Sequence, residues 1–273
     1  MASLLSIPEA ILLGVVEGIT EFLPISSTGH LIVVGRLIGF GTGDTRVAGD
    51  TYSVAVQFGA ILAVLVLYRQ RIMSMVKGLF GRDLHGRGVL LAVAAAFLPA
   101  AVLGIVVGDA VKDALFGPVP VMIAWLVGGI VLLVWKPRSG GLELHRLPLR
   151  SAVLIGFAQS IAFWPGVSRS LVTIIGGMLV GLTLAAAVEF SFLLGLVTLS
   201  AATFLDIGRH GGELVDRFGV LSPLIGLACA FVTALVSVRW MVQWLNTRSL
   251  RVFGWYRTCT AAAVLVLLAT NHL

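Results

Sequence analysis

The side chains best suited to chemistry in this sequence are two acids near the N-terminus, set within an apolar run. Glu17 and Glu21 are four residues apart, so a helix places both carboxylates on one face. Two carboxylates side by side and away from water disfavour each other's charge. We therefore expect a compensating cation, either a metal ion or an arginine. The alternative is that both acids are simply solvated at a helix end.

A hydroxyl-rich turn follows directly. Residues 24–30 read PISSTGH, a pattern that ends one helix and begins another. Ser26, Ser27 and Thr28 can cap the new helix, or they can form, with backbone N–H groups, a nest that binds an anion. His30 carries an imidazole that can act as base, acid or nucleophile near neutral pH. With two glutamates on the preceding helix, the pattern favours a functional site.

A second polar turn lies deep in apolar sequence, at residues 165–173, which read PGVSRSLVT. Its Arg169 offers a planar fork of donors that suits phosphate and keeps its proton. A purely structural ion pair of Arg169 with Glu17 or Glu21 is the alternative. The same turn supplies a glycine for close backbone approach and three hydroxyls: Gly166, Ser168, Ser170 and Thr173. Together the two turns predict one pocket with an acidic and a basic half, which a phosphate dianion and a divalent cation would fill.

The two turns belong to an internal repeat. The stretch 12–30 matches the stretch 154–172 at a constant offset of 142 residues. A repeated apolar helix that is interrupted by a turn of Pro, Ser and Gly is typical of discontinuous membrane helices around a binding site. The aligned pairs include Gly14 and Gly156, Glu17 and Gln159, Ser26 and Ser168, and Gly39 and Gly181.

The composition predicts an all-α integral membrane protein. Hydrophobic residues make up 58% of the 273 residues and charged residues only 12%, whereas a soluble domain carries about 25% charged residues. The net charge of +6 is expected to set membrane topology and not to bind nucleic acid. Six segments are long and apolar enough to be transmembrane helices: about 51–68, 88–108, 118–135, 184–205, 220–242 and 253–272.

The remaining apolar segments are too short to cross a membrane alone. Each pair of them flanks one polar turn, so we expect two re-entrant helical hairpins beside the six transmembrane helices. The whole chain, 1–273, is predicted to be a single membrane domain, with repeat 1 at about 1–136 and repeat 2 at about 150–273. The short segments lie near 8–22, 30–39, 150–163 and 170–182.

The charges of the connections predict the topology. The connections 69–87, 136–150 and 239–257 are rich in Arg and Lys, whereas 109–117 and 206–219 hold few bases and several acids. By the positive-inside rule, the first three face the cytoplasm. The first hairpin then enters from the outer face and the second from the inner face. Because each repeat is one hairpin plus three spans, the two copies are expected to be inverted, with their tips meeting near mid-membrane.

The two polar motifs closely resemble those of the bacterial undecaprenyl-diphosphate phosphatases of the bacitracin-resistance type. The resemblance rests on residues 17–30 and 165–173 and extends to Glu189 and to the pair Tyr256 and Arg257, so it covers nearly the whole chain. We expect that last pair to anchor the chain at a membrane interface. The acid-phosphatase type of lipid phosphatase is not supported, because no His or Asp follows Arg169 at short range.

The resemblance implies hydrolysis of undecaprenyl diphosphate to undecaprenyl phosphate, which recycles the lipid carrier for cell-wall synthesis and confers bacitracin resistance. It also implies a divalent cation, Mg²⁺ or Ca²⁺, and a multi-pass protein of the bacterial inner membrane whose site opens to the periplasmic face. In this hypothesis Glu21, helped by Glu17, holds the metal, and Arg169 neutralises phosphate charge. The nucleophile is Ser27, His30 or water; we favour Ser27 with His30 as its base.

A rival hypothesis from another class is a secondary transporter or flippase of a polyprenyl phosphate. Inverted repeats with broken helices are also typical of transporters, and the same turns could grip a head group without cleaving it. An imidazole beside a hydroxyl cluster favours catalysis, because a grip alone does not need it. A homodimer is the assembly to test; the sequence does not decide it.

Overall fold

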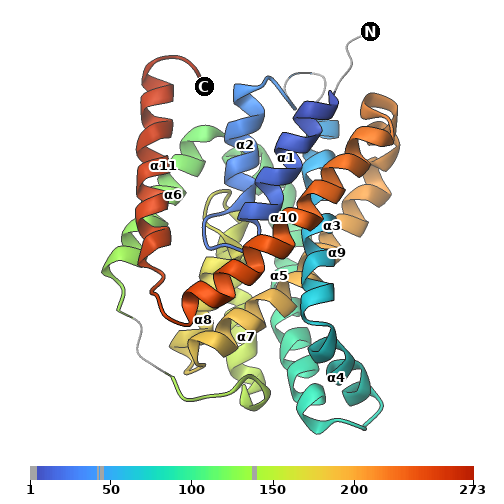
Figure 1. Ribbon diagram of the computed structural model, residues 1–273, viewed down its shortest axis with the longest axis vertical. Coiled ribbons are helices and arrows are strands. Elements are labelled where there is room, and N and C mark those ends of the chain that lie inside the picture. Colours follow the sequence, from blue (N-terminus) through green and yellow to red (C-terminus); the bar gives the residue numbers. More distant parts are fainter. Residues whose placement is uncertain (1–4, 42, 44–45, 137–139) are drawn as a thin grey trace.

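Helices account for almost all of the regular structure. The computed structural model describes residues 5–41, 43, 46–136 and 140–273 (Figure 1); Arg138, one base of the predicted 136–150 connection, lies outside them. Within these residues no β-strand forms; two residues, Leu142 and Leu182, make an isolated bridge. The helices are α1 (Ile7–Thr20), α2 (Ser27–Leu37), α3 (Arg46–Leu67), α4 (Arg69–Leu79), α5 (Leu84–Leu115), α6 (Pro118–Val134), η2 (Leu144–Arg146), α7 (Leu149–Gln159), η3 (Ser160–Phe163), α8 (Arg169–Leu179), α9 (Leu184–Phe218), α10 (Leu221–Leu245) and α11 (Arg251–Ala269).

Five of the six predicted spans are long, apolar helices. Within the described part of the chain, α3, α5, α9, α10 and α11 are long and apolar enough to cross a membrane. The sixth, α6, has 17 residues, which is the lower limit for a transmembrane helix. The prediction of an all-α multi-pass membrane protein is therefore confirmed.

Each predicted hairpin is a pair of short helices joined by a turn; their re-entry into the membrane stays a prediction. In Figure 1, α1 and α2 occupy the upper half of the molecule and α7 and α8 the lower half, so the turns between them approach from opposite sides. The N-cap of each second helix is a serine with a positive φ, Ser26 with φ of 71° and Ser168 with φ of 76°. These two serines are 142 residues apart, and so are Gly39 and Gly181, which also have positive φ. The repeat thus preserves an unusual backbone as well as a sequence.

The packing of the helices follows the same repeat. Helix α1 packs on α10, and its counterpart α7 packs on α5. Both crossings use an aligned glycine: a Cβ at Gly14 would lie 2.2 Å from the carbonyl oxygen of Gly226, and one at Gly156 would lie 2.4 Å from that of Ala96. Helices α3 and α9 pack together, and so do α6 and α11. A two-fold axis that relates the two halves of the chain would produce these helix pairs. The boundaries of the two repeats stay a prediction.

The basic connection predicted at 69–87 contains a helix that the sequence reading did not anticipate. Helix α4 packs against the start of α5. The carboxylate of Asp83 caps α5 by accepting from Gly86 N (2.8 Å) and also accepts from Ser74 Oγ (2.6 Å). The apolar residues of α4 recur with a helical period, as is typical of an amphipathic helix that packs one face on a neighbouring helix.

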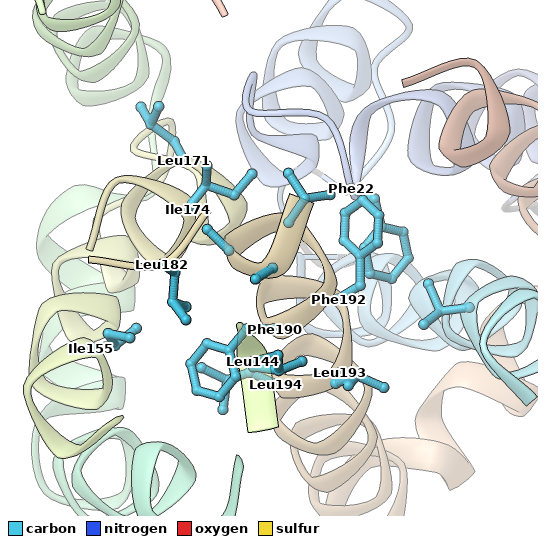
Figure 2. Packing of buried hydrophobic residues seen from close by; sticks show 14 of the residues in the cluster. Phe22, Leu144, Ile155, Leu171, Ile174, Leu182, Phe190, Phe192, Leu193 and Leu194 are labelled. Atoms are coloured by element: carbon cyan, nitrogen blue, oxygen red, sulfur yellow. The ribbon is translucent and has the colours of Figure 1, made fainter. Parts of the chain in front are cut away.

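A large cluster of buried apolar side chains lies around the two hairpins and α9 (Figure 2) and extends to α3, α5 and α10. Phe22, next to the first turn, meets Phe192 of α9 edge to face, with ring centroids 5.2 Å apart, and Phe192 in turn contacts Tyr68. Lipid tails are as apolar as these rings, so the core gains stability from close packing and not from the exclusion of water. The aromatic contact fixes Phe22, and with it the adjacent Glu21, against α9.

Candidate active site

The structure joins the acidic turn to the basic turn through one carboxylate. Arg169 Nη2 donates to Glu21 Oε1 at 3.1 Å, and Ser27 Oγ donates to Glu21 Oε2. Three residues that the sequence reading placed in one pocket are therefore in direct contact. The compensating cation that the protein supplies to Glu21 is therefore an arginine.

Arg169 is held by α9 as well as by Glu21. Its Nη1 donates to the carbonyl oxygen of Ser191 at 2.9 Å, and its guanidinium carbon lies 5.7 Å from the centre of the Phe22 ring. Its Nε is buried without a partner among the described residues. A Cβ at Gly195 would lie only 2.2 Å from Nη1. Gly195 is thus the residue that makes room for the guanidinium, and nothing in the local sequence around it signalled this.

A cavity of about 540 Å³ opens onto this group. Its floor combines residues of both turns, its walls are largely apolar surfaces of α3, α5 and α9, and its far end carries Lys112, Asp206, Arg209 and His210. Such a cavity, apolar with a few convergent polar groups, is the usual form of a small-molecule site. The predicted site residues on its floor are Glu21, Ser26, Ser27, Thr28, Ser168 and Arg169.

The other five predicted site residues lie behind the cavity wall. Ser170 is fully buried and donates to the carbonyl oxygen of Leu23 at 2.9 Å. Thr173 is fully buried too and donates to Ser191 Oγ at 2.7 Å. These two hydroxyls brace the turns, and their predicted contact with substrate stays a prediction. The residues that do not line the cavity are Glu17, His30, Gly166, Ser170 and Thr173.

Gly166 has a structural role in the backbone of the second turn. Its φ is +94°, and a Cβ there would lie 2.8 Å from the carbonyl oxygen of Val121 on α6. The predicted close approach of the Gly166 backbone is therefore present, but the group that it approaches is helix α6. On the cavity side, Ser168 Oγ lies 3.0 Å from Ser170 Oγ and accepts from Leu171 N at 3.2 Å.

The first turn has its carbonyl oxygens satisfied by side chains. Irregular backbone at membrane depth cannot bond to water, so it is tolerated only where protein groups replace water. The carbonyls of residues 23–26 accept hydrogen bonds at 2.9, 3.2, 2.9 and 2.6 Å, in that order, from Ser170, Arg257, Trp125 and His30.

Arg257 ties the two turns together, so the interpretation of it as an interfacial anchor was wrong. The side chain is fully buried. It donates to Pro24 O of the first turn and to Gly166 O and Val167 O of the second, at 2.9–3.2 Å, and to Ala124 O of α6 at 2.8 Å. One signal could have found it: Arg257 is the only Arg or Lys between residue 252 and the last residue, 273.

The imidazole of His30 is held on both sides and does not reach Ser27. Nδ1 lies 2.6 Å from the carbonyl oxygen of Ser26, so Nδ1 carries the proton, and Nε2 accepts from Tyr256 Oη at 2.8 Å. The ring also packs against Trp125 and Tyr256. Among the described residues, Ser27 hydrogen-bonds to Glu21 and not to His30. The geometry therefore favours Glu21 as the acceptor of the Ser27 proton.

Glu17 contributes a buried carboxylate that has no hydrogen-bond partner among the described residues. Both of its carboxylate oxygens are fully buried and accept no hydrogen bond from the described residues. Within the described ranges no group of three or more His, Cys, Asp or Glu could hold a metal ion. Two neighbouring carboxylates are a donor set that Mg²⁺ accepts when phosphate oxygens and water complete its coordination.

These features define a polytopic α-helical membrane protein in which two interrupted helices build a buried site of carboxylate, hydroxyl and arginine. The family model described as bacitracin resistance protein BacA matches residues 10–263, and the chain belongs to this family. It is 44% identical to the undecaprenyl-diphosphatase of Sorangium cellulosum, over 94% of this chain and 85% of that protein. It is 42% identical to undecaprenyl-diphosphatase 1 of Chromobacterium violaceum, over 94% of each chain.

Proposed function

We propose that this protein is an integral membrane phosphatase that hydrolyses undecaprenyl diphosphate to undecaprenyl phosphate and inorganic phosphate. The observation that carries the proposal is the contact of Ser27, Glu21 and Arg169 on the floor of a largely apolar cavity. The names of its relatives give the substrate. Hydrolysis of this diphosphate recycles the lipid carrier for cell-wall synthesis and lowers sensitivity to bacitracin, in line with the family's name.

In the mechanism that fits the geometry, Ser27 Oγ attacks the terminal phosphorus. The bond from that phosphorus to the bridging oxygen breaks, and undecaprenyl phosphate leaves. Glu21 accepts the Ser27 proton and passes it to the leaving phosphate, while Arg169 neutralises the charge that develops on the phosphoryl oxygens. Water then cleaves the phosphoserine and regenerates Ser27. His30 has a different task in this scheme, since its two nitrogens hold the first turn in place.

A divalent cation, Mg²⁺ or Ca²⁺, belongs to the proposal as well. Glu17 and Glu21 would hold it together with phosphate oxygens, and the orphaned oxygens of Glu17 support this assignment. When bound, the cation would neutralise negative charge on the diphosphate. The protein's own part is to keep the two carboxylates buried on one side of the end of α1, with Glu21 in contact with the Ser27 hydroxyl.

We place the protein in the bacterial inner membrane with the cavity open to the periplasm. The end of the cavity marked by Lys112 and His210 lies at the stretches 109–117 and 206–219. These stretches are poor in bases and were predicted as connections, but they largely form the C-terminal turns of α5 and α9. Helix α4, which contains Arg69 and Arg71, lies at the other end of the molecule (Figure 1). The positive-inside rule puts the basic end in the cytoplasm. Cross-linking at working concentration in the membrane will decide between a monomer and the homodimer considered above.

The deciding experiment measures phosphate release from undecaprenyl diphosphate by the purified protein, with and without a chelator. We expect release by the parent, loss of release in chelator, and a drop of at least about 100-fold in Arg169→Ala. Lys112→Ala is the matched control, because it also removes a positively charged side chain, but from the far end of the cavity. A parent protein that binds the lipid diphosphate but releases no phosphate would instead support the transporter hypothesis.

A further inference from the structure

Gln159, the repeat counterpart of Glu17, lines the cavity and carries a buried acceptor without a partner among the described residues. Its side chain is 3% exposed, and it lines the cavity together with Ser168 and Arg169. Its Oε1 is buried without a hydrogen-bond partner among the described residues. A buried acceptor without a partner is unfavourable, so the observation calls for a ligand that donates a hydrogen bond.

The orientation of this amide is fixed by chemistry. Nε2 donates to the carbonyl oxygen of Ala96 on α5 at 3.2 Å. Only the NH₂ group of the amide can donate to a carbonyl, so a flipped amide would set two oxygens against each other. Oε1 must therefore point away from Ala96. The close crossing of α7 and α5 at Gly156, one turn earlier, brings the amide to this carbonyl.

The two copies of the repeat have diverged at this position in a way that suits two tasks. Glu17 lies behind the cavity wall and brings a charge, whereas Gln159 lies on the wall and brings a neutral acceptor. A fully ionised diphosphate offers only acceptors, so it cannot satisfy Oε1. The reaction has one other participant, water, which donates two hydrogen bonds.

We infer that Gln159 Oε1 binds the water molecule that hydrolyses the phosphoryl group. The inference rests on the proposed phosphatase function. In the second step the water oxygen forms a bond to phosphorus and the bond from phosphorus to Ser27 Oγ breaks. One water proton passes through Glu21 to Ser27 Oγ, which becomes a hydroxyl again, and the other leaves on the phosphate ion. Gln159 accepts a hydrogen bond from this water and so orients its oxygen toward phosphorus; it is a positioning residue.

Two variants separate this role from a structural one. Gln159→Met keeps the length of the side chain but has neither the acceptor nor the donor. Gln159→Glu keeps an acceptor oxygen and lacks the NH₂ group that bonds to Ala96. Gln243→Met, on the exposed face of α10, is the matched control. For each protein, kcat and KM are measured with lipid labelled at its terminal phosphate, and label retained on the denatured protein reports the phosphoserine.

We expect kcat to fall about 100-fold in Gln159→Met with KM nearly unchanged, labelled protein to accumulate, and Gln159→Glu to recover most of kcat. The control should match the parent. Equal losses of kcat in both Gln159 variants, with equally lowered thermal stability, would assign a structural role through Ala96 and overturn the inference. So would a Gln159→Met protein with parental kcat. A parent protein that releases no phosphate would overturn the proposed function, and this inference with it.

Discussion

Gly195 offers a way to disturb Arg169 without touching any polar group. This glycine faces the guanidinium from α9, in the middle of a long helix. In Gly195→Ala the new Cβ would lie 2.2 Å from Nη1 and 2.5 Å from Cζ of Arg169. Both distances are far below van der Waals contact, so the guanidinium has to move by about 1 Å or more.

The expected effect is large on activity and small on stability. Arg169 loses its present bonds to Ser191 O (2.9 Å) and Glu21 (3.1 Å) when it moves. A misplacement of about 1 Å at a reacting centre costs about 100-fold in rate, which corresponds to about 2.7 kcal/mol of transition-state stabilisation. The arginine is the flexible end of a side chain and can yield, while alanine favours a helix interior over glycine by about 1 kcal/mol. This gain offsets part of the cost of the two lost hydrogen bonds, about 0.5–1.5 kcal/mol each, so thermal stability should fall only slightly.

The assay compares kcat/KM for phosphate release and the melting temperature of three proteins. Gly208→Ala is the matched control, since it makes the same exchange on the same helix and its Cβ would meet nothing within 4 Å. We expect about a 100-fold loss in Gly195→Ala only. Parental activity in Gly195→Ala, or an equal loss in the control, would refute the assignment of Arg169 to the phosphoryl group.

Four further predictions concern the turns and the helix ends. In Arg257→Met four carbonyl oxygens lose their donor, which destabilises the fold by about 1–3 kcal/mol each. Part of this loss is offset because the variant no longer buries a cation. Activity and melting temperature should both drop, whereas Arg251→Met, an exposed arginine on the same helix, should change neither. Ser27→Ala should abolish phosphate release and covalent labelling; a fully active variant would exclude Ser27 as nucleophile. Glu21→Gln should weaken the response of activity to Mg²⁺, and an unchanged titration would argue against metal binding there. The hydrogen bonds from Gly86 N and Ser74 Oγ lower the pKa of the Asp83 carboxyl. Its stabilisation is therefore present above the ordinary pKa of about 3.9 and lost as pH falls through the lowered value. Melting curves of the parent and of Asp83→Ala should converge at acid pH.

The main features of the site could be predicted from local sequence because each one is a local pattern. Membrane location follows from hydropathy, and the hairpins follow from a polar turn between two short apolar segments. The offset of 142 residues pairs Ser26 with Ser168, and the structure gives these two serines the same unusual backbone. The acid–arginine contact was one of the two compensations considered for the acids, a metal ion or an arginine, because a buried charge needs a partner.

Which predicted residues face the cavity could not be read from the sequence. Glu17 and Gln159 occupy equivalent positions in two similar helices, yet only Gln159 lines the cavity. The difference arises from what packs on each helix. A repeat preserves local geometry, but its neighbours, α10 in one copy and α5 in the other, differ in sequence.

The sequence by itself determined the class of protein, the two interrupted helices and the polar residues at their turns, because hydropathy, turn chemistry and the repeat are encoded within short windows. Only the tertiary structure decided that Arg257 joins the two turns, that Gly195 makes room for Arg169, and that His30 pairs with Tyr256 instead of Ser27. Each of these contacts links residues far apart in the chain. Whether a long side chain spans two turns or faces lipid depends on how the helices are brought together, which no local pattern specifies.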